Sequence, residues 1–129
     1  MRLENWQSKL NKHLQTVGAF EWGKNDCCMF AVGCVQAMTG VDHGKPYRGY
    51  KTARGALKRL EDHGGVEGIA AIELGEPKPI KQAKRGDVVS FKTGDEIALG
   101  ISVGDKIVGI GEKGLIFLPF DDGINAWSV

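Results

Sequence analysis

Two adjacent cysteines, Cys27 and Cys28, follow an aspartate in the segment FEWGKNDCCMFAVGCV, which covers residues 20–35. A thiol becomes a good nucleophile when its pKa falls, and the exposed N–H groups at a helix N-terminus lower that pKa. Asn25 or Asp26 offers an N-cap for a helix that begins here. Helical spacing places Cys27, rather than its neighbour, on the face toward the rest of the fold. The pattern makes Cys27 a candidate nucleophile, with a buried, inert thiol as the alternative interpretation.

The other residues with suitable chemistry are the remaining cysteine and the three histidines. A metal site built from the three cysteines lacks any familiar ligand spacing, so we expect neither a metal nor another cofactor. His43 lies in the turn-rich segment DHGKPYRGYKT, and a loop could bring it over Cys27 as an alternative base. His13 and His63 are expected to be structural or solvated, because one lies beside a helical apolar stripe and the other ends a helix.

Length and composition limit the classes of protein to consider. A chain of 129 residues is enough for one domain, and its formal net charge of +1 argues against nucleic-acid binding. The N-terminal residues lack the apolar run of a secretory signal, and no stretch is long enough to span a bilayer. The odd number of cysteines suggests reduced thiols. We therefore expect one domain that is made in a cytoplasm without a signal peptide.

The apolar periodicity changes along the chain from helical to strand-like. Amphipathic helices are predicted over residues 3–17, 27–38 and 52–63, with a weaker helical turn or two over 66–74. From Gly86 onward, short β-branched runs separated by glycine-rich turns predict an antiparallel meander, and the final NAWSV is a candidate edge strand. The fold class is α+β, with one domain over residues 1–129, a helical part at about 1–75 and a β part at about 86–129.

Several side chains are assigned an environment from these patterns. Four residues of the third helix should face inward: Ala53, Ala56, Leu57 and Leu60. A basic run before the sheet should be solvated: Lys78, Lys81, Lys84 and Arg85. The tryptophans are candidate contact anchors where exposed: Trp6, Trp22 and Trp127.

The order of several motifs resembles the NlpC-type cysteine peptidases, relatives of papain that cut peptidoglycan peptides. WGKNDCCMFA, RGDVVSF and ALGISVG correspond to that family's Asp-Cys helix start and its two following strand motifs. The chain is still more similar to a phage tail-associated offshoot of the family. The motifs that it has in common with this offshoot extend over nearly the whole chain. They are F-x-WG-x-x-DCC, YRGYKTARGA, a GG pair, RGDVV and the terminal motifs GLIFLP and AW. The resemblance implies N-terminal helices packed on a C-terminal antiparallel sheet or small barrel.

Carried over to this sequence, the resemblance makes Cys27 the nucleophile position and Asp26 the residue that caps the helix before it. The family's catalytic histidine aligns with Ala98, and its third polar residue falls near Gly109. A methyl group cannot accept a proton, so the usual thiolate–imidazolium pair cannot form at Ala98. Glu96 is expected on the same strand face, but a carboxylate raises the pKa of a nearby thiol and is a poor substitute.

The resemblance thus implies a phage or prophage tail-tip protein that serves assembly or architecture with a degenerate hydrolase site. Its expected partners are other tail proteins, in an oligomeric tail, and its expected locations are the host cytoplasm and then the virion. The alternative is an active, peptidoglycan-cleaving endopeptidase that uses Cys27 with a base from elsewhere. A host-made regulatory or inhibitor protein is a third possibility, for which the sequence shows no dedicated motif.

Overall fold

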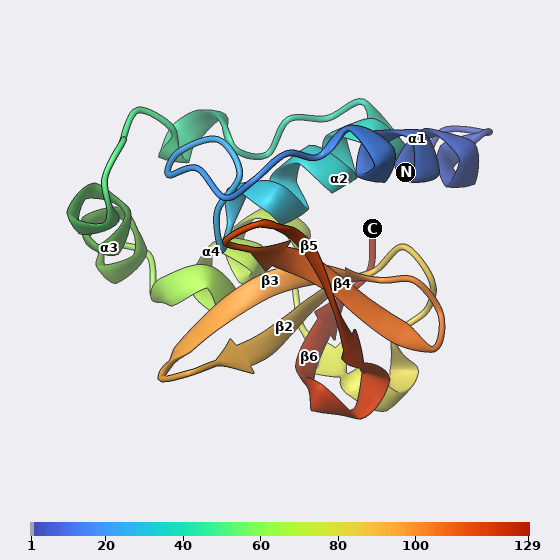
Figure 1. Ribbon diagram of the computed structural model, residues 1–129. Helices are drawn as coiled ribbons and strands as arrows, with labels where there is room; N and C mark the ends of the chain where they lie inside the picture. Colours follow the sequence, from blue (N-terminus) through green and yellow to red (C-terminus); the bar gives the residue numbers. More distant parts are fainter. Residues whose placement is uncertain (1) are drawn as a thin grey trace.

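The computed structural model describes residues 2–129, as four helices and a six-stranded antiparallel sheet (Figure 1). The helices are α1 (Trp6–Thr16), α2 (Met29–Thr39), α3 (Ala53–Glu61) and α4 (Gly65–Leu74). The strands are β1 (Lys78–Pro79), β2 (Val88–Thr93), β3 (Glu96–Ser102), β4 (Lys106–Gly111), β5 (Gly114–Pro119) and β6 (Gly123–Trp127). The α+β class with helices first is confirmed.

The order of strands in the sheet is β1-β6-β2-β3-β4-β5, so only β2 to β5 form the predicted meander. The C-terminal strand β6 pairs with β2 on one side and with β1 on the other. The prediction of a C-terminal edge strand is therefore wrong. The two-residue β1, which lies between the predicted helical and β parts, occupies that edge instead. Strand pairing between distant segments is not visible in a local pattern of side chains.

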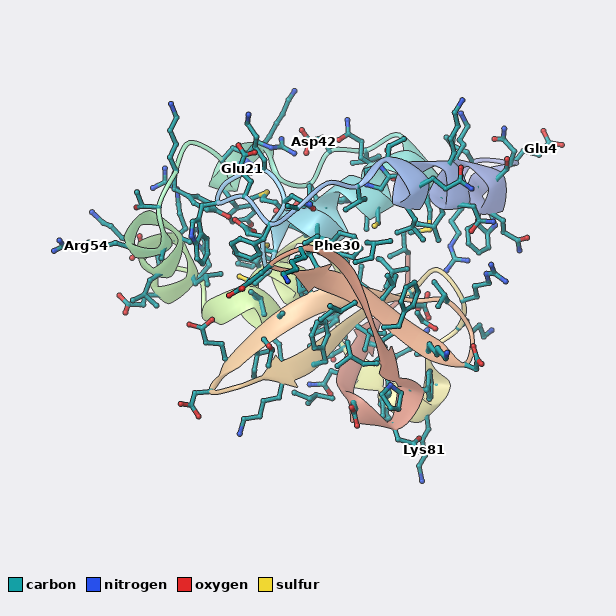
Figure 2. The ribbon with its side chains drawn as sticks, viewed as in Figure 1. Glu4, Glu21, Phe30, Asp42, Arg54 and Lys81 are labelled. Atoms are coloured by element: carbon teal, nitrogen blue, oxygen red, sulfur yellow. The ribbon has the colours of Figure 1, made fainter. Side chains whose placement is uncertain are left out.

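Alternation along the strands divides the apolar side chains between two clusters, as expected for the two faces of a sheet. Val88 faces the larger cluster, which the helices cover, and its neighbour Val89 belongs to the smaller one with Phe91 and Ala98. In Figure 1, α1 and α2 lie along one side of the sheet, and Figure 2 shows Phe30 of α2 between the helices and the strands. Side chains from β5 and from the segment after β1 pack on the smaller cluster, so the sheet curls around it.

The helices depart from the sequence predictions at their ends and on their exposed faces. The first helix begins at Trp6, so Leu3 lies outside it and is 39% exposed. The stretch predicted as a turn or two is the ten-residue helix α4, which buries Val66 and Ile69. Leu57 was predicted to face inward, but it is 56% exposed. Periodicity gives the apolar face of a helix, but it does not say whether another element covers that face.

Two other predicted environments are corrected by long-range contacts. Lys78 is not a solvated side chain, because its Nζ lies 2.7 Å from Oδ2 of the buried Asp87. Arg2 donates to Oδ1 of the same aspartate at 2.9 Å, so two cations neutralise one buried carboxylate. Trp127 is no contact anchor, since it is 1% exposed in the core. Trp6 is partly buried beneath the guanidinium of Arg2.

Candidate functional site around Cys27

Cys27 lines a cleft of about 620 Å³ between α3, the α3–α4 turn and the start of β3. The apolar part of the lining includes Trp22, Leu57 and Ile97, and the last two of these are substantially exposed to solvent. The exposed face of α3 therefore forms one wall of a cleft. The apolar stripe of α3 that was predicted to face inward therefore borders the cleft, and its Ala56 is also buried.

A buried carboxylate fixes the loop that carries Cys27. Asp26 is fully buried, and its Oδ1 accepts hydrogen bonds from the backbone N–H groups of Cys28 and Met29. Its Oδ2 accepts from the Gly23 N–H and the Tyr50 hydroxyl. Four donors thus hold one side chain. Asp26 binds the N–H groups of the first residues of α2 but is not its N-cap, which is Cys28, so the prediction that Asp26 caps the helix is wrong in position. Burial, and then the hydrogen bond to Asp26, raises the pKa of the Tyr50 hydroxyl.

The helix itself begins later than predicted, and this changes the environment of the thiol. The first residue of α2 is Met29 and its N-cap is Cys28, so Cys27 precedes the helix. Its carbonyl accepts a hydrogen bond from Leu99 N–H of β3 at 2.8 Å, which joins the loop to the sheet. The side chain of Cys27 is partly buried against both apolar clusters. The loop therefore places this cysteine against β3.

The electrostatic environment keeps the Cys27 thiol protonated. Burial, followed by the charges of Asp26 and Glu96, raises the pKa of Cys27 to about 12. A backbone hydrogen bond acts in the opposite direction and does not offset them. The pKa reduction expected near a helix N-terminus is therefore outweighed. Cys28 and Cys34 are buried, and burial also raises the pKa of each of these thiols.

No imidazole of residues 2–129 lines the cleft. His43, the predicted alternative base, has Nδ1 3.0 Å from Oε1 of Glu73 on α4. His63 has Nδ1 2.7 Å from the Arg59 carbonyl, and its ring makes an edge contact with a tyrosine. His13 belongs to α1, and its burial lowers its pKa. None of the three imidazoles lines the cleft, although His63 lies in the α3–α4 turn between the lining residues Glu61 and Gly64.

The two positions at which the resemblance expected polar catalytic groups are apolar and closely packed. Ala98 is 6% exposed and belongs to the smaller cluster, on which Cys27 also packs. A Cβ atom added to Gly109 would lie 2.7 Å from Cζ of Phe91, so this ring fills the space that a side chain at 109 would need. A Cβ atom at Gly100 would lie 3.0 Å from Cε1 of the same ring. A side chain at position 109 would require Phe91 to move.

Three carboxylates on the walls of the cleft give it an acidic character. They are Glu61, Glu67 and Glu96, and the sequence reasoning noticed only the last. Oε2 of Glu67 accepts hydrogen bonds from the Ser90 hydroxyl at 2.7 Å and from Nδ2 of Asn125 at 2.9 Å. Glu67 lies in the first turn of α4, a helix that the sequence only partly predicted. The acidic wall could have been found only from the packing of that helix on the sheet.

Residues 2–129 contain no group of three or more histidine, cysteine, aspartate or glutamate side chains arranged to hold a metal ion. None of the helices there is both long and apolar enough to cross a bilayer. The cleft beside Cys27 is therefore the feature on which the functional argument depends.

Comparisons with known proteins place the chain in a family without identifying an activity. No curated protein and no solved structure matched it. A family model described as a domain of unknown function, DUF6950, matches residues 1–129, and the chain belongs to that family.

Proposed function

We propose that this protein is a structural or assembly component of a phage or prophage tail tip, with an NlpC-like fold and a cysteine site that does not hydrolyse peptides. The observation that carries the non-hydrolytic part is the environment of Cys27, which combines a raised pKa with the absence of an imidazole on the described cleft walls. The tail assignment is supported by the ordered motifs of the sequence.

The chemistry expected of Cys27 is far below that of a cysteine peptidase. With a pKa of about 12, roughly one thiol in 10⁵ is ionised at pH 7. Amide cleavage also needs a proton for the leaving amine, and losing positioned acid–base catalysis costs about 10² to 10⁴ in rate. Glu96 supplies negative charge beside the sulfur, which opposes formation of the thiolate. The same groups leave an apolar, acidic cleft that is suited to binding.

The occupant that this cleft favours is a segment of another tail protein with basic side chains among apolar ones. Glu61, Glu67 and Glu96 face it from three different elements, and Trp22 and Ile97 supply apolar surface. The cation on the lining, Arg54, projects outward from α3 in Figure 2 rather than across the cleft. Complementary charge would steer such a segment and fix its register.

The hydrolytic alternative has one observation in its favour, which is that the Cys27 side chain reaches the cleft. Peptidoglycan digestion by wild-type protein and by the Cys27→Ala variant separates the two functions. Equal, background-level release of fragments is expected from both proteins. Release by the wild type that disappears in the variant would establish the hydrolase and reject the non-hydrolytic site.

Tail membership has its own test, independent of catalysis. Mass spectrometry of isolated tails and of tail-assembly intermediates from the source virus or prophage should detect this chain. In the same preparations, the double variant Glu61→Gln, Glu96→Gln should be retained less well than wild type. The matched control is Glu112→Gln, an exposed glutamate in the β4–β5 turn outside the cleft. Absence of the protein from both tails and intermediates would refute the assignment.

A further inference from the structure

The first residues of β3 have one side that no other strand covers in the described part of the chain. β3 pairs with β2 over six residues, from Glu96 to Ile101. Its register with β4 covers only Ile101 and Ser102. In Figure 1, the β2–β3 hairpin extends away from β4 and β5. The side of β3 that faces β4 at its end is therefore open at its beginning.

Two hydrogen bonds show which backbone groups face this open side. The Ser102 N–H donates to the carbonyl of Asp87, which directly precedes β2, so the backbone groups of Ser102 face β2. The Leu99 N–H donates to the Cys27 carbonyl at 2.8 Å, on the opposite side of the strand. Backbone groups of successive residues alternate between the two sides of a strand. The N–H and C=O of Ile97 therefore face the open side, where no residue of 2–129 bonds them.

The open side of β3 lies inside the cleft beside Cys27. Side chains of successive strand residues project from opposite faces of a sheet. Ile97 shares the helix-covered face with Leu99, and Glu96 shares the other face with Ala98. Both Glu96 and Ile97 line the cleft. A space bordered by both faces of one strand includes the edge between those faces, so the Ile97 N–H and C=O open into the cleft.

The charges and backbone groups around this edge favour one kind of occupant. Glu96 precedes Ile97 on the strand, and Glu61 and Glu67 line the same space from α3 and α4. The cation of the described lining, Arg54, projects outward in Figure 2. An unpaired N–H and C=O at a strand edge suit the backbone of an extended peptide. The edge is therefore complementary to an extended segment with basic side chains.

We propose that an extended peptide binds in the cleft as an additional antiparallel strand on β3, and that one of its residues exchanges two main-chain hydrogen bonds with Ile97. Opposed residues in an antiparallel pair share a face, so the peptide residue opposite Ile97 faces the helices and is apolar. Its two neighbours lie on the face of Glu96 and are basic. The inference rests on the proposed function, because it specifies the conformation and sequence pattern of the segment that this cleft receives.

The first experiment measures amide hydrogen exchange at Ile97 in the full-length protein by NMR, with acetyl-Lys-Val-Lys-Val-Lys-amide as the probe. In the free protein, the Ile97 N–H should exchange faster than the bonded N–H of Leu99. At a probe concentration ten times its Kd, exchange at Ile97 should slow about tenfold, because only about one molecule in eleven is then free. A probe that binds but leaves this rate unchanged would overturn the inference, as would no binding at millimolar concentrations.

Modified probes test the main-chain bonds and the charge pattern separately. Methylating both valine nitrogens removes the donors that face β3 and should raise the Kd about three- to tenfold. The matched probe carries two methyl groups on the nitrogens of the second and third lysines, which face outward, and should bind nearly as well as the unmodified probe. Equal weakening by the two modifications would contradict the strand pairing. Equal affinity for acetyl-Glu-Val-Glu-Val-Glu-amide would reject the basic pattern.

Variants of Ile97 test the same contact from the protein side. Ile97→Pro and Ile97→Ala both lose the isoleucine side chain, but only the first loses the N–H. Proline is tolerated at an edge position whose N–H is unpaired, and thermal melting should show that both variants fold. The Kd of the basic probe should be about three- to tenfold higher for Ile97→Pro than for Ile97→Ala, and equal values would overturn the inference.

Two further outcomes separate this inference from its alternatives. Self-association of the protein that Ile97→Pro abolishes would identify a second copy as the occupant of the cleft and reject the basic peptide. Because the probes are synthetic peptides, their failure to bind would leave the tail assignment intact. Absence of the protein from isolated tails would in turn reject the tail assignment without changing the exchange rate measured at Ile97.

Discussion

The reactivity of Cys27 offers the most direct quantitative test of the environment described for the site. Its pKa of about 12 compares with roughly 8.5 for an unperturbed cysteine. At pH 8 the ionised fraction falls from roughly one in four to about one in 10⁴, a loss of about 2,000-fold. A more basic thiolate is also a better nucleophile, with a Brønsted coefficient of roughly 0.4–0.5, which returns a factor of about 25 to 50. The net expectation is a rate about 50- to 100-fold lower than that of an ordinary cysteine.

The assay is exchange with a small neutral disulfide, 2-hydroxyethyl disulfide, with the mixed disulfide at Cys27 located by fragment-ion mass spectrometry. The same protein in denaturant supplies the reference rate, and Cys27→Ser identifies any signal from the neighbouring cysteine. In the folded protein, the rate should increase about tenfold per pH unit from pH 7 to 9.5 without reaching a plateau, because the thiol ionises well above this range. A plateau near pH 8–9, or a folded rate within fivefold of the reference, would refute the reasoning.

Four further substitutions test residues around the site. Glu96→Gln should raise the exchange rate of Cys27 by about two- to fivefold in the same assay. The increase is small because an exposed carboxylate destabilises a nearby thiolate by only about 1 kcal/mol or less. An unchanged or lower rate would contradict the assigned charge effect. Asp26→Asn should lower the free energy of unfolding by about 2–4 kcal/mol in urea titrations, because it turns an amide donor toward other donors. Tyr50→Phe removes one of the four hydrogen bonds to Asp26 and should lower it by only about 1–2 kcal/mol. Equal losses in the two variants would show that the aspartate has no wider role. Gly100→Ala should reduce the melting temperature strongly, because the new Cβ atom would clash with the backbone carbonyl oxygen of Val108. A variant as stable as wild type would disprove this close packing.

The predicted strands were the most accurate part of the sequence analysis, and the reason is local. β2 to β5 are short β-branched runs between tight turns, and such turns bring consecutive strands together. β6 was recognised as a strand but given the wrong place, because its neighbours β1 and β2 lie about 35 to 50 residues away in the chain. Period and turn chemistry determine the face of a strand, whereas the choice of a distant partner depends on the whole packed sheet.

For the site, the position of the key residues was predictable and their environment was not. The Asp26–Cys27 pair and the opposing Ala98 were identified from motif order, and the structure places both parts on the same loop–sheet junction. The direction of the pKa shift depends first on burial, which a sequence does not specify. The ring that blocks Gly109 belongs to Phe91, a residue from another strand. Contacts of this kind arise only when the sheet curls.

The contacts of Arg2 also have a practical consequence for engineering. Its Nε donates to the carbonyl of Val129 at 2.8 Å, while its guanidinium also reaches Asp87, so the first and last described residues meet at one corner of the molecule. A peptide inserted before residue 2 would therefore leave the molecule beside one that follows residue 129. The same proximity makes the chain suitable for circular permutation, in which a short linker joins residues 2 and 129 and new ends are opened in an exposed turn.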